Sequence, residues 1–297
     1  MSKKRVAAKK SKSGAKSKRP ARRSARTLMS VATSAKRTVE DRLAALAEVP
    51  IVFHEDEAHV QGVLGVLGDQ EEPVEVQFAA LETLQAAAFG DASYATWRGD
   101  YITTLRKIVA EADADAELRQ RALGVLAREK DGFAQARLLE GLQSPEKAVV
   151  PPEKALQLLS YDVHAEAYSV ARDIVSKPPN TAAKREALRL LAADASSAPL
   201  FERLLRDKGE ETEIRQVSAA ALHAVRPKRL QNLAREILLD ESESEELRNT
   251  SLTALTHFGG EAVAADEELL QRVTTLRGQG SAKLKQGARR FIGKYSR

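Results

Sequence analysis

The segments "IRQVSAAAL" (214–222) and "LRNTSLTAL" (247–255) decide the fold of this 297-residue chain. Each has an apolar first residue, an arginine second, a serine fifth and a leucine ninth. In a helix the first, fifth and ninth residues share one stripe, which predicts an amphipathic helix. The small fifth residue, Ser218 or Ser251, would allow a neighbouring helix to approach closely.

The same pattern recurs at intervals of about 33 residues, a period typical of stacked structural repeats. The other copies are "VQFAALETL" (76–84), "LRQRALGVL" (118–126), "PPEKALQLL" (151–159), "AKREALRLL" (183–191) and the degenerate "LKQGARRFI" (284–292). A second amphipathic stretch precedes each copy, for example at 101–112 and 230–239. Each repeat therefore predicts a helical hairpin, and hairpins of this kind stack to cover their apolar faces.

These "LR" and "A-L-x-x-L" patterns resemble the HEAT-repeat family, in its short variety similar to the phycobilisome-lyase HEAT-like repeats. The resemblance covers roughly residues 50–297. It implies an all-α fold, a right-handed α-solenoid of about seven stacked hairpins (HEAT-like or armadillo-like), which binds proteins or nucleic acids along an extended surface. The copy at 151 departs from the pattern with Pro151 and Pro152, where the superhelix is expected to bend although proline suits a first helical turn.

Charge divides the chain into two expected regions. Residues 1–37 contain fourteen Lys or Arg and no Asp or Glu, whereas the remainder holds all 42 acidic residues against 33 basic ones. The first region also lacks apolar periodicity, which is typical of disorder. We therefore expect a disordered basic tail at 1–37 and a HEAT-like solenoid at 38–297.

The tail is expected to bind DNA, RNA or another polyanion, because unstructured basic segments gain affinity by releasing counterions. The candidate contacts are Lys3, Lys4, Arg5, Lys9, Lys10, Lys12, Lys16, Lys18, Arg19, Arg22, Arg23 and Arg26. Three alternatives stay open: a nuclear or transit signal within "KSKRPARR" (16–23), contact with an anionic membrane surface, and a purely solubilising tail.

A basic residue recurs at the second position of the repeat, and two interpretations remain open for it. These residues are Arg119, Lys184, Arg215, Arg248 and Lys285. Stacking would align them in a ladder that could follow phosphates. Alternatively, each pairs with an acid or a carbonyl of a neighbouring repeat, which the acidic residues just upstream of several copies favour.

Two further motifs suggest sites less strongly. His54 and His59 are five residues apart, about 140° around a helix, so they cannot both face one metal ion; we expect no metal site there. Tyr94, Trp97 and Tyr101 could form an exposed aromatic anchor, but their spacing favours a buried stripe.

Composition excludes several function classes. The absence of Cys removes disulfides and thiol chemistry, and "GQGSAK" (278–283) lacks the context of a phosphate-binding loop. We expect no enzyme, catalytic residue or cofactor. No run of about 20 apolar residues could span a membrane, so we expect an intracellular protein that is cytoplasmic, nucleoid-associated or, in a eukaryote, nuclear.

The sequence thus predicts a non-catalytic scaffold or adaptor, whose solenoid binds a protein while the tail contacts nucleic acid. One alternative is a protein-only adaptor with a sorting signal. Another is a HEAT-like DNA-repair glycosylase.

Overall fold

The computed structural model describes residues 24–50, 53, 56–90 and 93–295, and this part of the chain contains helices and turns but no strand. Two compact units divide the chain, residues 1–104 and residues 105–297. None of the helices in the described ranges combines the length and the apolar character that a bilayer crossing requires.

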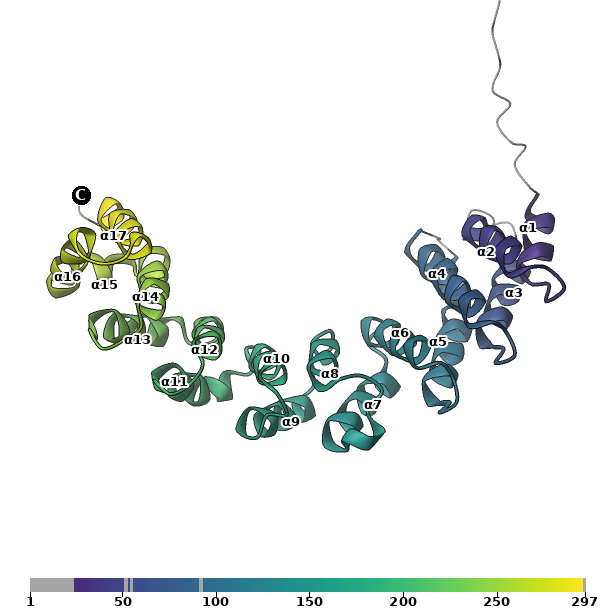
Figure 1. The fold of residues 1–297 in the computed structure, drawn as a ribbon, viewed down its shortest axis with the longest axis horizontal. Helices are drawn as coiled ribbons and strands as arrows, with labels where there is room; N and C mark the ends of the chain where they lie inside the picture. Colours follow the sequence, from purple (N-terminus) through teal and green to yellow (C-terminus); the bar gives the residue numbers. More distant parts are fainter. Residues whose placement is uncertain (1–23, 51–52, 54–55, 91–92, 296–297) are drawn as a thin grey trace, which may run out of the picture. The chain divides into compact units, whose positions relative to one another are not determined.

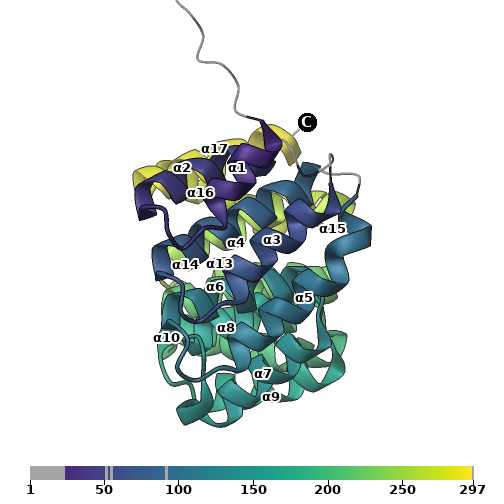
Figure 2. The ribbon, with the colours of Figure 1, turned by 90° about the vertical axis from the view of Figure 1, so that its right-hand side faces the viewer.

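The first unit contains two hairpins and most of a fifth helix. Its helices are α1 (Ala25–Ala32), α2 (Val39–Glu48), α3 (Glu57–Gly68), α4 (Val74–Gly90) and the start of α5 (Tyr94–Ala110). Helix α1 packs on α2 and α3 packs on α4, while α2 also packs on α4 (Figure 2). The two hairpins of this unit therefore contact each other through their second helices, α2 and α4.

Helix α1 corrects the expected boundary of the tail. It lies inside segment 1–37, so disorder is wrong for residues 25–32, whereas residues 1–23 lie outside the described residues. The Ser24 side chain accepts a hydrogen bond from the Thr27 backbone N–H and so begins α1. Leu28, Met29 and Ala32 are buried, which means that α1 belongs to the folded body.

Helix α2 carries a copy of the repeat that the sequence pattern did not reveal. The segment "DRLAALAEV" (41–49) has a small fifth residue, Ala45, a leucine sixth and an apolar ninth, Val49. Asp41 replaces the apolar first residue, and this hid the copy. The described residues therefore contain eight copies of the repeat, one more than the seven that the sequence pattern identified.

The second unit is a stack of hairpins in two helical layers (Figure 1). One layer consists of α6 (Ala116–Arg128), α8 (Pro152–Leu159), α10 (Thr181–Leu191), α12 (Thr212–Val225), α14 (Glu245–Phe258) and α17 (Ala282–Tyr295). The other consists of α7 (Gly132–Gln143), α9 (Ala165–Ser176), α11 (Ala198–Arg206), α13 (Pro227–Leu239) and α16 (Glu267–Gly278). Three short elements occur in the connections between these helices: η2 (Pro145–Lys147), η3 (Ala195–Ser197) and α15 (Gly260–Ala264).

The small fifth residue of each copy is buried, as the sequence predicted. These residues are Ala45, Ala80, Ala122, Ala155, Ala187, Ser218, Ser251 and Ala288. The copy at 151 also forms its helix, α8, with Pro152 at the first helical position. The chain therefore has the all-α architecture of a HEAT-like solenoid, in which the spacing between helices depends on these small side chains.

We predict that Ala80→Leu lowers the free energy of unfolding by about 1–3 kcal/mol, because extra methylene groups overpack a filled core. Ala80 is buried in α4. The matched control is Ala86→Leu, on an exposed position of the same helix, which should change stability by less than about 0.5 kcal/mol. Urea denaturation of both variants measures the difference, and equal midpoints would contradict the packing argument.

Candidate anion-binding interface

The second residue of the repeat, called here the ladder residue, bonds backward to a carbonyl ten residues earlier. Arg215 donates from Nε and Nη2 to the Leu205 carbonyl at 3.0 and 2.8 Å. Arg42 Nε donates to the Ala32 carbonyl at 3.1 Å. These carbonyls lie in the last turn of the preceding helix, whose acceptors have no partner within the helix. The ladder residue thus satisfies the end of its own hairpin's first helix.

The same register recurs in two further copies. Gln77 Nε2 donates to the Leu67 carbonyl at 3.4 Å, and Arg119 Nε and Nη2 donate to the Val109 carbonyl at 3.4 and 3.3 Å. Gln77 is uncharged, so the backward bond requires an N–H donor and does not require a cation.

In three copies the ladder residue also bonds forward, to a glutamate that lies four residues before the next copy. Arg215 donates to both carboxylate oxygens of Glu243 at 2.9 and 2.6 Å, and their side chains are only 5% and 4% exposed. Arg42 pairs in the same bidentate way with Glu72, at 2.5 and 2.6 Å. Lys184 pairs with Glu210. Bidentate pairs of this kind fix geometry as well as charge.

The Glu243 carboxyl shows the balance of forces in this ladder. Burial alone would raise its pKa, but hydrogen bonds from Arg215 and from the Ser244 backbone N–H hold the pKa below its ordinary value. Glu243 is therefore ionised at neutral pH and compensates the Arg215 charge.

Arg248 departs from this arrangement. It is 9% exposed, and its Nε and Nη2 atoms have no hydrogen-bond partner within the part of the chain that the structure describes. The position four residues before the next copy is Gly280, which has φ +120°. The forward carboxylate is thus replaced by a residue without a side chain. Lys285, the remaining candidate, is half-buried in α17.

A polar groove lies between α14 and α17, next to Arg248 in the sequence. It has a volume of about 90 Å³, and its lining residues are Asn249, Thr253, Thr256, His257, Lys283, Gln286, Gly287 and Arg290. The two helices approach closely at Gly287, where a Cβ atom would lie 2.9 Å from Leu252 Cδ2 and 3.2 Å from Asn249 Oδ1. Carboxylates are absent from this lining.

The cations of the groove differ from those cations of the second unit that pair with carboxylates. Lys283 and Arg290 are exposed, and neither has an ion-pair partner among the described residues. By contrast, Lys208 pairs with Asp240 and Arg235 pairs with Asp266. Residues 269–297 contain eight Lys or Arg and no Asp or Glu. This local run of basic residues is the sequence signal that indicates the groove. The net negative charge of residues 38–297, taken as a whole, hides it.

The remaining sequence candidates fall in different places. Of the tail candidates, the structure describes only Arg26, which is exposed on α1; the other eleven fall within residues 1–23 and so outside the described residues. His54 is also outside them, and no group of three His, Cys, Asp or Glu in the described ranges could hold a metal.

The aromatic residues at 94–101 form a buried stripe, as their spacing favoured. Trp97 and Tyr101 are buried, and Trp97 contacts Tyr94, Tyr101 and Phe53 edge to face with ring centroids 4.8, 5.8 and 6.4 Å apart. Trp97 therefore stabilises the first unit and is not an exposed anchor.

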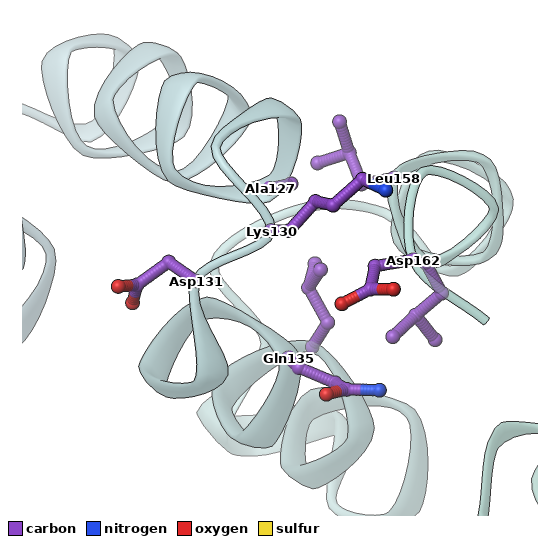
Figure 3. A pocket seen from close by; sticks show the side chains of 8 residues that line it. Ala127, Lys130, Asp131, Gln135, Leu158 and Asp162 are labelled. Atoms are coloured by element: carbon purple, nitrogen blue, oxygen red, sulfur yellow. The ribbon is translucent and has the colours of Figure 1, made fainter. Parts of the chain in front are cut away.

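A second hollow, beside the turn between α6 and α7, is too small for a ligand. Figure 3 shows Lys130, Gln135 and Asp162 around it, with Asp131 directed away. Its volume is about 10 Å³, which corresponds to one water molecule. Asp131 instead pairs with Arg106 at 2.6 Å. This hollow is a packing gap between hairpins.

Comparisons with known proteins assign no family to this chain. No protein-family model matches the sequence, and no curated protein matches it. Among solved structures, the complex of CpcE and CpcF of phycocyanin lyase from Nostoc sp. PCC7120 is similar, with 14% identity and a TM-score of 0.27. The match covers 96% of this chain and 99% of the other.

One expectation needs correction after this comparison. The expectation that this chain is not an enzyme is corrected, because the similar solved structure is a complex of phycocyanin lyase. A TM-score of 0.27 nevertheless assigns no reaction or substrate to this chain.

We predict opposite effects for two ladder substitutions. Arg215→Met leaves the buried Glu243 without its partner, so it should lower the free energy of unfolding by about 3–5 kcal/mol. Arg248→Met removes a buried charge that has no partner among the described residues, so stability should stay the same or rise. Urea denaturation of the two variants compares them directly. Equal losses would show that the forward carboxylate does not determine the cost.

We also predict loss of stability in acid. The ionised carboxyls have lowered pKa values: Asp131, Glu140, Asp194, Glu202, Asp240, Glu243 and Asp266. Hydrogen bonds from Lys208 and Ser242 lower the pKa of Asp240 to about 2. Their stabilisation is complete above the unfolded-state pKa values, about 3.9 to 4.3, and is lost as pH falls through the folded-state values. Melting temperature should therefore fall between about pH 4 and pH 2; a constant value over this range would contradict it.

Proposed function

We propose that this protein is a scaffold or adaptor, whose HEAT-like solenoid binds a protein partner while its basic N-terminal segment contacts nucleic acid. The observation that carries the proposal is the charge of that segment. Residues 1–37 hold fourteen Lys or Arg without one acidic residue, and clustered cations gain affinity for phosphates by releasing counterions.

The pairing of cations in the solenoid supports this division of roles. Arg42, Lys184 and Arg215 are already bonded to glutamates of the next repeat. To contact a phosphate, each would have to leave a carboxylate that is itself largely buried, which is costly. The ladder is therefore a poor phosphate track, and the tail remains the principal candidate for contact with nucleic acid.

Exposed aromatic side chains support the binding of a protein partner. Phe89 is 97% exposed, and Tyr161 and Phe258 are about half-exposed. Aromatic residues supply much of the binding energy at protein interfaces. Large aromatic side chains that remain in solvent are therefore candidate anchors for a partner on the solenoid surface.

A second candidate function rests on the segment "KSKRPARR" (16–23). Short Lys/Arg-rich segments also act as nuclear localisation signals. In that case the solenoid is a protein-only adaptor, and the segment directs it to a compartment without contacting nucleic acid.

We predict that neutralising the tail reduces nucleic-acid affinity and its dependence on salt. The tail-neutral variant replaces the twelve candidate tail cations by Gln in the full chain, which avoids a truncation. Fluorescence anisotropy with a 20-base-pair duplex DNA, and with RNA of the same length, is measured between about 50 and 200 mM salt. Each lost phosphate contact should reduce the log–log slope by about 0.9 on DNA. Equal affinity and slope for both proteins would exclude the tail and favour a localisation signal.

A further inference from the structure

The groove between α14 and α17 has the geometry of a preformed site. Asn249 of α14 lies beside Gly287 of α17, and the Lys294 ammonium donates to the Thr256 carbonyl at 2.6 Å. Residue numbers thus increase in the same direction on both helices, which run parallel. Tyr295 Oη fixes the same end by donating to the Leu255 carbonyl at 2.9 Å.

Both walls of the groove present hydrogen-bond donors. On α17, Lys283, Gln286 and Arg290 are spaced by three and four residues, so they share one face. On α14, Asn249, Thr253 and His257 are spaced by four residues and also share one face. Side chains of these types make most of the contacts to phosphate oxygens in protein–nucleic acid complexes.

The charge of the groove is not compensated within the described residues. Lys283 and Arg290 have no ion-pair partner there, and the lining contains no Asp or Glu. Arg248 precedes Asn249 on α14 but does not line the groove, so the charge of the groove comes from Lys283 and Arg290. A cation without an internal partner remains able to attract an external anion.

We propose that this groove is a second, folded site that binds the phosphate backbone of a nucleic acid. Lys283 and Arg290 would contact phosphates, while the side-chain amides of Asn249 and Gln286 would donate to phosphate or sugar oxygens. The inference rests on the proposed function, because in both the ligand is a nucleic acid. It does not depend on binding by the tail.

The lining favours a phosphate backbone over an acidic peptide. Protein interfaces take most of their binding energy from apolar and aromatic anchors in pockets, and this groove offers none, since its lining is hydroxyl, amide, imidazole and cationic groups around a glycine. Lys283 and Arg290 are two helical turns apart, roughly 10 Å along the axis. That distance corresponds to a rise of about three base pairs along the axis of a duplex, at about 3.4 Å for each charge of one strand.

The test uses the full chain with the tail-neutral substitutions, so that only folded sites remain. Into this background we introduce Lys283→Gln with Arg290→Gln. The matched control is Arg206→Gln with Lys208→Gln, which removes the same charge from cations already paired with Glu236 and Asp240. Anisotropy with the 20-base-pair duplex and with a polyglutamate peptide is measured across the same salt range. Melting temperature verifies folding, which we expect to persist because Lys283 and Arg290 are exposed.

We expect the tail-neutral chain to retain measurable DNA affinity, and the groove substitutions to reduce it by about tenfold or more and the slope by about 1.8. The control should lose much less. An undetectable affinity in the tail-neutral chain, equal losses for groove and control, or tighter binding of polyglutamate than of DNA would overturn the groove proposal. Unchanged affinity on tail neutralisation, with loss on groove substitution, would support the groove while excluding the tail.

Discussion

The Arg215 guanidinium, at the second position of its repeat, is the interaction that joins two successive hairpins of the second unit, and Arg42 repeats it in the first unit. Arg215 completes the end of α11 through the Leu205 carbonyl and reaches forward to Glu243 before α14. One side chain therefore satisfies a helix terminus and connects two successive repeats. Because both partners are buried, the interaction fixes the register between hairpins, and it would be costly to break from either side.

Close approach of the helices is the second constraint, and it depends on the small fifth residue. Ala187 and Ser218 are buried, and Ser218 satisfies its own hydroxyl by donating to the Ile214 carbonyl at 2.8 Å. A serine is thus tolerated at this buried position between helices without a hydrogen-bond partner from another helix. Hydrophobic packing supplies most of the stabilisation, and the ladder selects one register among those that packing alone would allow.

The sequence predicted the part of the structure that is periodic. Apolar stripes and the small fifth residue identified seven copies, because local helix geometry alone produces that pattern. The first copy escaped because Asp41 occupies the apolar position, although Arg42 was present as its ladder residue. The groove escaped for a different reason, because the pairing of a cation depends on a residue about 30 positions away. Lys184 and Lys283 both lie in or next to a copy of the repeat that is rich in basic residues. Only the structure shows that Lys184 pairs with Glu210, whereas Lys283 has no ion-pair partner among the described residues.

This distinction determines which cations can serve binding. A phosphate that approached Arg215 would have to displace Glu243, and the released carboxylate would remain buried without its cation. The attraction gained at one group would be offset by the desolvation cost at the other. A phosphate that approached Lys283 or Arg290 would displace only water and loosely held counterions, which is the favourable term in nucleic-acid binding. The number of basic residues on a solenoid is therefore a poor measure of its affinity for polyanions, which depends on how many of those residues the fold leaves without a carboxylate.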